Sequence, residues 1–244
     1  MTLGGALKAL LGDLAALFPR RGARTWFLLA AAAVLQVAFW YLASPGPQLI
    51  GYAPRDLPTA MVGITWTVVI LLALPALLFT TTGGSLKEMG LTRGDHRFGW
   101  PAVAVCVLIA VPVVALSSGD ASGLAGAYPW AGDEIGRSLG SFLGWALLYA
   151  LYYLAFEAFY RGFLLRTLDR QFGTVMAVWL QAFAATLVHL GKPLPEVLAA
   201  LPASLLFGVI AVRTRSVVYP ALVHLAIGLT LDLVLLARAG TLLS

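Results

Sequence analysis

The chain alternates between long apolar runs and short polar segments. The apolar runs lie at roughly 25–43, 59–79, 99–117, 138–160, 173–190, 196–212 and 217–237. Most of them approach the ~20 residues that a helix needs to cross a bilayer. The pattern therefore predicts an all-α fold, a polytopic membrane helix bundle with about seven transmembrane helices.

A different periodicity marks the first residues of the chain. Leucines recur there at steps of three and four, at Leu3, Leu7, Leu10, Leu14 and Leu17. This spacing predicts an amphipathic helix that lies on the membrane surface and stops before Pro19. We expect residues 1–24 to form this interfacial helix and a basic linker, and residues 25–137 to form three transmembrane helices.

Composition supports the membrane assignment for the whole chain. Hydrophobic residues make up 60% of the sequence and charged residues only 11%, whereas a soluble domain has about 25% charged residues. The net charge of +5 comes from positive residues in short loops, so we expect contact with the lipid bilayer and no nucleic-acid partner. Cys106 is the single cysteine, which excludes an internal disulfide and a thiolate metal cluster.

The positive residues also predict an orientation. Only four of the sixteen, Arg55, Arg137, Lys192 and Arg238, fall outside the N-terminal segment and the loops near 80–98, 161–172 and 213–216. Positive residues concentrate in cytoplasmic loops. We therefore expect an integral protein of a bacterial cytoplasmic membrane, with its N-terminus in the cytoplasm and its C-terminus outside.

Charged side chains inside an apolar run need an explanation, because each costs at least ~2.5–3.5 kcal/mol at the bilayer centre. Glu157 and Arg161 stand in the run 149–165, four positions apart and hence on one helix face. Glu157 is a candidate functional carboxylate, and Arg161 a residue that braces it. A purely structural salt bridge is the alternative.

Two histidines occupy equally apolar surroundings, His189 at the end of the fifth run and His224 inside the seventh. If Phe172 and Gly173 form the turn of a helical hairpin, Glu157 and His189 lie at equal depth on adjacent helices. His224 reaches a similar depth only if residues 161–172 continue as helix beyond the membrane face.

The chemistry of this set allows two interpretations. A glutamate can act as the general base that activates water, with a histidine donating to the oxyanion of a tetrahedral intermediate. Glu157, His189 and His224 would also suit a zinc ion with an open position for water. Spacing alone does not separate these two chemistries.

Three further polar residues lie close to this set along the chain. Asp232 follows His224 by two helical turns, about 80° around the helix, and could border the same cavity. Lys192 and Glu196 flank the loop after His189 and could line its outer mouth. We treat all three as candidate substrate-binding residues, although a capping carboxylate and a plain surface loop would also explain them.

The segment 138–237 resembles the CPBP family of intramembrane proteases, which includes CAAX prenyl endopeptidases and Abi-type proteins. The family pattern is Glu-Glu-x-x-x-Arg, often followed by Gly, then a histidine, then a second histidine with Asn four residues later. Glu157, Arg161 and Gly162 fit its second Glu, Arg and Gly, and His189 and His224 fit the histidines. The resemblance implies an intramembrane endopeptidase without a cofactor, acting on a membrane-anchored protein or its C-terminal tail.

Two positions depart from that pattern. Phe156 stands where the family has its first Glu, the proposed catalytic base, and Gly228 stands where it has Asn. Glu157 would then act as the base itself, with His189 and His224 stabilising the oxyanion and Tyr153 or Asp232 supplying the missing contact.

The same two departures favour a rival, a non-catalytic relative with an immunity or scaffold role. A proton-coupled transporter that uses the buried ionisable groups as a relay is a third hypothesis. No inverted repeat of the apolar runs supports it.

Overall fold

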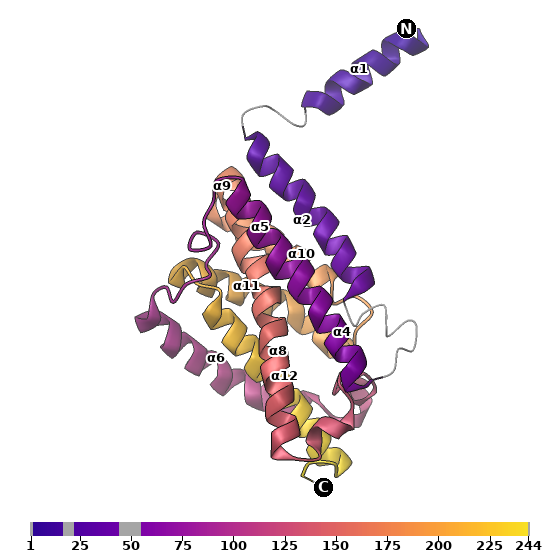
Figure 1. Ribbon diagram of the computed structural model, residues 1–244, viewed down its shortest axis with the longest axis vertical. Helices are drawn as coiled ribbons and strands as arrows, with labels where there is room; N and C mark the ends of the chain where they lie inside the picture. The colour runs from indigo at the N-terminus through magenta and orange to yellow at the C-terminus, as the bar shows by residue number, and fades with distance from the viewer. Residues whose placement is uncertain (1, 17–21, 44–54, 244) are drawn as a thin grey trace.

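The computed structural model describes residues 2–16, 22–43 and 55–243, and within these ranges its regular secondary structure is entirely helical. The long helices form a bundle, and α1 extends away from it at the N-terminal end (Figure 1). The helices are α1 (Leu3–Ala16), α2 (Ala23–Leu42), α4 (Leu57–Thr67), η1 (Val68–Ala73), α5 (Leu74–Thr81), α6 (His96–Ser117), η2 (Asp120–Ser122), α7 (Leu124–Ala127), η3 (Asp133–Gly136), α8 (Leu139–Glu157), η4 (Ala158–Leu164), α9 (Leu165–Phe172), α10 (Thr174–Leu187), α11 (Leu194–Thr214) and α12 (Val218–Ala239).

Six helices of the described chain are long and apolar enough to cross a membrane, so this is an integral membrane protein. They are Ala23–Leu42, Leu57–Thr81, His96–Ser117, Leu139–Phe172, Leu194–Thr214 and Val218–Ala239. The fifth of the seven expected spans is the shorter apolar helix α10, of 14 residues. At 1.5 Å per residue α10 is about 21 Å long, which is less than the ~30 Å hydrocarbon core.

The candidate functional residues lie along one long helix and the hairpin that follows it. Ser138 caps its start by accepting a hydrogen bond from the backbone N–H of Ser141 at 3.1 Å. The helix then runs without a break through α8, η4 and α9 to Phe172, 34 residues in all. That is about 51 Å, longer than the ~30 Å hydrocarbon core, so one end of the helix extends past the membrane face. His224 can lie at the depth of Glu157 only with such an extension. Gly173, with a φ of 77°, makes the expected turn into α10.

The N-terminal helix α1 has no buried residue. Leu3, Leu7, Leu10 and Leu14 are all exposed, which leaves its leucine face free for the membrane surface. Leu17 and Pro19, which completed the predicted pattern, lie outside the described residues.

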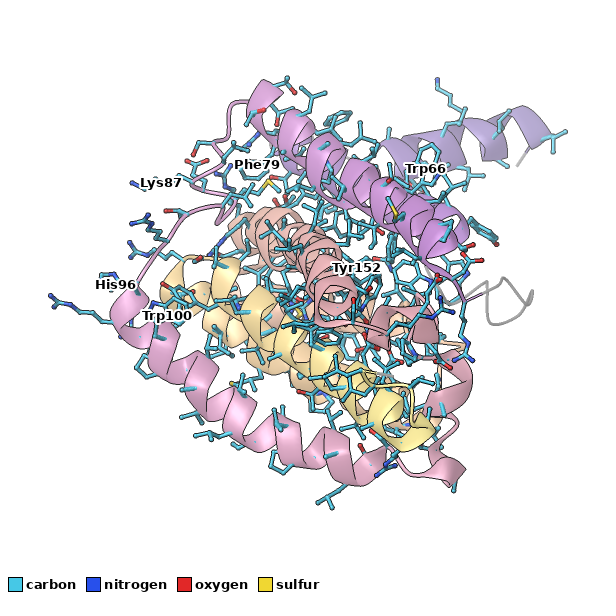
Figure 2. The ribbon with its side chains drawn as sticks, turned by 60° about the horizontal axis from the view of Figure 1, so that its bottom comes forward. Trp66, Phe79, Lys87, His96, Trp100 and Tyr152 are labelled. Carbon is cyan, nitrogen blue, oxygen red and sulfur yellow. The ribbon has the colours of Figure 1, made fainter. Side chains whose placement is uncertain are left out.

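The other helices pack along part of the long helix, whose α8 segment keeps one face exposed at Leu139, Leu143 and Leu147. α12 packs against both α6 and α8, and α10 packs against α9 and α11. Figure 2 shows Tyr152 of α8 inside the bundle. Lys87, in the segment that joins α5 to α6, and His96, the first residue of α6, lie at its outer edge. Side chains from residues 85–95, 166–170 and 212–215 share one surface depression, so the three predicted basic segments meet at one end of the bundle. The segment 161–172, which was expected as a loop, is helical.

Candidate active site

Glu157 is the centre of a buried ionic cluster. Its Oε1 atom lies 2.7 Å from Nδ1 of His224, on α12. Its Oε2 atom lies 3.0 Å from Nε of Arg161, one turn along the same helix, an ion pair whose angles fall short of a hydrogen bond. Glu157 and Arg161 are 0% and 1% exposed. Both carboxylate oxygens therefore have a charged or polar partner and none of the side chain is accessible.

The helix changes its winding at this point. The π-helical turn η4 begins at the residue after Glu157 and contains Arg161. Such wide turns occur mostly as short insertions in α-helices, often at functional sites. The guanidinium of Arg161 lies 5.4 Å from the ring centre of Phe207 and 5.9 Å from that of Phe156. Aromatic faces thus stabilise a buried cation that has one carboxylate partner.

His189 is placed by the turn that ends α10. The helix stops at Leu187, and the next residues form the turn that leads to Pro193 and α11. The Nδ1 atom of His189 lies 2.7 Å from the carbonyl oxygen of Ala185. This hydrogen bond fixes the ring plane and turns Nε2 toward α11, where Oε1 of Glu196 lies 3.9 Å away.

A second polar cluster adjoins His189. The Nζ atom of Lys192 lies 2.6 Å from Oε1 of Glu196. The hydroxyl of Tyr128, from the segment between α7 and η3, lies 2.9 and 2.8 Å from the two oxygens of Glu196. Lys192 also donates to that hydroxyl at 3.3 Å.

These two clusters border one cavity with two adjoining lobes, the larger of which extends along α11 and α12. Both lobes are lined by His189, His224, Glu196, Tyr153 and Phe156. The structure thus brings together the two histidines, Tyr153, Lys192 and Glu196 of the predicted set. Arg161 lines the larger lobe, and Glu157 lies behind His224.

Tyr153 occupies the space beside Gly228. A Cβ atom on Gly228 would lie 2.4 Å from the hydroxyl oxygen of Tyr153 and 2.9 Å from its ring. The ring of Tyr153 stacks on that of His224, with 4.2 Å between their centres. A phenol hydroxyl therefore stands next to the position at which the family pattern has Asn.

Phe156 forms an apolar part of the cavity lining. Its ring centre lies 6.2 Å from that of His189 and 5.5 Å from that of His224. The position at which the family pattern has its first Glu therefore faces both histidines, but here it presents no proton acceptor.

Asp232 lies apart from the cavity residues. It is fully buried and its Oδ2 atom accepts a hydrogen bond from Nε1 of Trp145 at 2.8 Å. The other oxygen, Oδ1, is buried without a hydrogen-bond partner. The structure thus gives Asp232 a partner on α8 that the sequence did not indicate.

A metal site was the chemical alternative for Glu157, His189 and His224. Among the residues that the structure describes, no three His, Cys, Asp or Glu side chains are grouped so as to hold a metal ion. The described side chains therefore do not form the three-ligand set that a zinc ion at Glu157, His189 and His224 would need.

Sequence reasoning did not find Tyr128 or Trp145. Tyr128 belongs to an irregular segment between two spans, and Trp145 to an apolar run in which one aromatic residue looks like another. Their roles arise from contacts with Glu196 and Asp232, 68 and 87 positions away.

Comparison with known proteins gives a family match for this part of the chain. The family model of type II CAAX prenyl endopeptidases, Rce1-like, matches residues 138–230. The match confirms the CPBP resemblance over these residues and supports a protease. No curated protein and no solved structure matches the chain.

Proposed function

We propose that this protein is an intramembrane endopeptidase that hydrolyses a peptide bond of a membrane-associated protein with glutamate-activated water. One observation carries the proposal. His189, His224 and Glu196, from three segments of the matched region, line one cavity inside a membrane helix bundle.

The depth of the cavity fits this function. His189 follows Gly173 by about 22–24 Å of helix and turn, so the turn after α10 lies within the thickness of the bilayer. Irregular backbone is tolerated at that depth where it lines a cavity or is buried in protein. Residues 188–193 form such a turn, and Val188, His189 and Lys192 line the cavity.

Glu157 takes a positioning role in this proposal. The sequence suggested that it activates water, but its oxygens face His224 and Arg161 and it has no exposed surface. A carboxylate on Nδ1 fixes the orientation of an imidazole and stabilises its protonated form. The Nε2–H of His224 can then donate to the oxyanion that forms on the scissile carbonyl.

The family match suggests a first substrate to assay. A membrane-anchored peptide with a farnesylated cysteine, two aliphatic residues and a variable last residue fits a family of CAAX prenyl endopeptidases. A peptide with the same tail and a transmembrane anchor in place of the farnesyl group covers the wider class. Both can carry a quenched fluorophore across the scissile region.

The test uses the protein in proteoliposomes with these two peptides. We expect cleavage by the wild type and a loss of about 100-fold or more in Glu157→Gln and His189→Ala. We also expect cleavage to persist in chelator. Cleavage at the wild-type rate by either variant would contradict the mechanism.

A non-catalytic binding protein is the second candidate, because Phe156 presents a ring where the family pattern has a carboxylate. In that case both peptides would bind and neither would be cut. Binding would survive Glu157→Gln but would be lost in Ala203→Trp, which fills the larger lobe of the cavity.

A further inference from the structure

A carboxylate reaches the ring of His189 from a helix outside the family motif. Glu196 stands in the first turn of α11 and places Oε1 3.9 Å from Nε2 of His189. Glu196 is 21% exposed as a side chain, in contrast to 0% for Glu157. It is thus the glutamate of this site that small molecules in the cavity can reach.

The hydrogen bond on the far side of His189 decides what its Nε2 atom can do. The carbonyl oxygen of Ala185 only accepts, so Nδ1 of His189 carries the hydrogen of that contact. In the neutral ring Nε2 is then an acceptor. Burial and the nearby Lys192 ammonium both disfavour protonation of Nε2, which would make this ring positively charged.

Two acceptors therefore face each other across 3.9 Å. The carboxylate of Glu196 and Nε2 of His189 cannot bond to each other when both lack a hydrogen. A water molecule that donates one hydrogen to each, over two hydrogen bonds of about 2.8 Å, spans this separation. The cavity contains the polar partners that such a water needs.

The residues around Glu196 hold its carboxylate in place. Lys192 at 2.6 Å favours the ionised form, and the Tyr128 hydroxyl, next to the ammonium at 3.3 Å, donates to the same carboxylate. The Lys192 ammonium also makes the Glu196 carboxylate a weaker base. Burial partly offsets this effect, because it disfavours the charged form of the carboxylate.

Resting on the proposed function, we propose that Glu196 is the general base that activates the hydrolytic water. Phe156 and Glu196 both face His189, so the carboxylate missing at position 156 is supplied by α11. Glu196 accepts a proton from water while the water oxygen bonds to the scissile carbonyl carbon and the π electrons move to the carbonyl oxygen. When the C–N bond breaks, its electron pair stays on nitrogen, and Glu196 returns the proton to the leaving amine.

The test compares three variants with the farnesylated peptide in proteoliposomes. We expect Glu196→Gln to lower kcat about 100- to 10,000-fold with little change in KM. We expect formate, a small carboxylate, to restore part of the lost turnover in Glu196→Ala. Glu134→Gln, an exposed carboxylate on η3 away from this cavity, is the matched control and should keep the wild-type kcat.

The outcomes separate this inference from the proposed function. A Glu196→Gln protein that turns over at the wild-type rate overturns the inference, while cleavage by the wild type leaves the function standing. A loss confined to KM, or one that formate does not restore, makes Glu196 a binding or structural residue and also overturns it. If the wild type cuts neither the farnesylated peptide nor the peptide with a transmembrane anchor, both the proposed function and this inference are wrong.

Discussion

Nδ1 of His224 lies 2.7 Å from Oε1 of Glu157, a contact that joins α12 to α8 across 67 positions of sequence. The second oxygen of the same carboxylate lies 3.0 Å from Nε of Arg161. The three side chains form a chain of charge and hydrogen bonding that ends at the cavity, where His224 is accessible. This arrangement gives the Glu-x-x-x-Arg motif of the chain a physical role, the orientation of a histidine.

Removing the charge of Glu157 should destabilise the protein. Glu157→Gln leaves the buried guanidinium of Arg161 without its carboxylate, and breaking a buried pair costs about 3–5 kcal/mol. The double variant Glu157→Gln/Arg161→Met removes both charges and should regain most of that stability. Thermal unfolding in detergent measures both.

The exposed pair of Arg170 and Glu88 is the control for this prediction. Its atoms lie 3.1 Å apart with side chains 41% and 52% exposed, so Glu88→Gln should cost less than about 1 kcal/mol. Equal losses of unfolding free energy in Glu88→Gln and Glu157→Gln would show that burial does not make the pair of Glu157 and Arg161 more important for stability.

Gly228→Ala should displace Tyr153 from His224. The added methyl would lie 2.4 Å from the hydroxyl of Tyr153 and 2.9 Å from ring atoms of Tyr153 and Tyr149. Overpacking of this kind costs about 1–3 kcal/mol. We expect at least a tenfold loss of cleavage. In a double-mutant cycle, the loss of cleavage caused by Gly228→Ala should be smaller in a Tyr153→Leu background than in the wild type. Strict additivity of the two substitutions would argue against this contact.

Asp232 should affect stability more than cleavage. Trp145→Phe removes the one hydrogen bond of a buried carboxylate, and an unsatisfied group of this kind costs about 1–3 kcal/mol or more when charged. Adding Asp232→Leu should restore the melting temperature and leave kcat near that of the wild type. A large loss of kcat in the double variant would instead support Asp232 as a substrate-binding residue.

The membrane orientation can be measured with introduced cysteines, because Cys106 is the single cysteine of the chain and is easily replaced. In a Cys106→Ser background, a cysteine at Arg170 should react with an impermeant maleimide only from the cytoplasmic side. A cysteine at Leu139, at the other end of the same long helix and 63% exposed, should react from outside. The reverse pattern would invert the topology that the loop charges predict.

Local relationships in the sequence predicted much of this site. The Glu157–Arg161 pair follows from one helical turn, and the hairpin from Gly173. The apolar run predicts a helix end near residue 190, whereas α10 stops at Leu187. Gly191 and Pro193, which do not continue a helix, were the signal for that earlier end.

Long-range packing decided what the sequence could not. The contact between Glu157 and His224 depends on how α12 packs against α8. The approach of Glu196 to His189 depends on where the turn after His189 directs α11. Tyr128 comes from a segment without periodicity, and no pattern in the chain points to its contact with Glu196.

Hydrolysis of the farnesylated peptide in H₂¹⁸O by proteoliposomes of the wild type tests the central claim most directly. Mass spectrometry should find one ¹⁸O atom in the new carboxyl terminus, because the attacking oxygen comes from water, and no product with the His189→Ala/His224→Ala variant. Intact peptide with the wild type, at the level of that double variant, would contradict the assignment of this cavity to a protease.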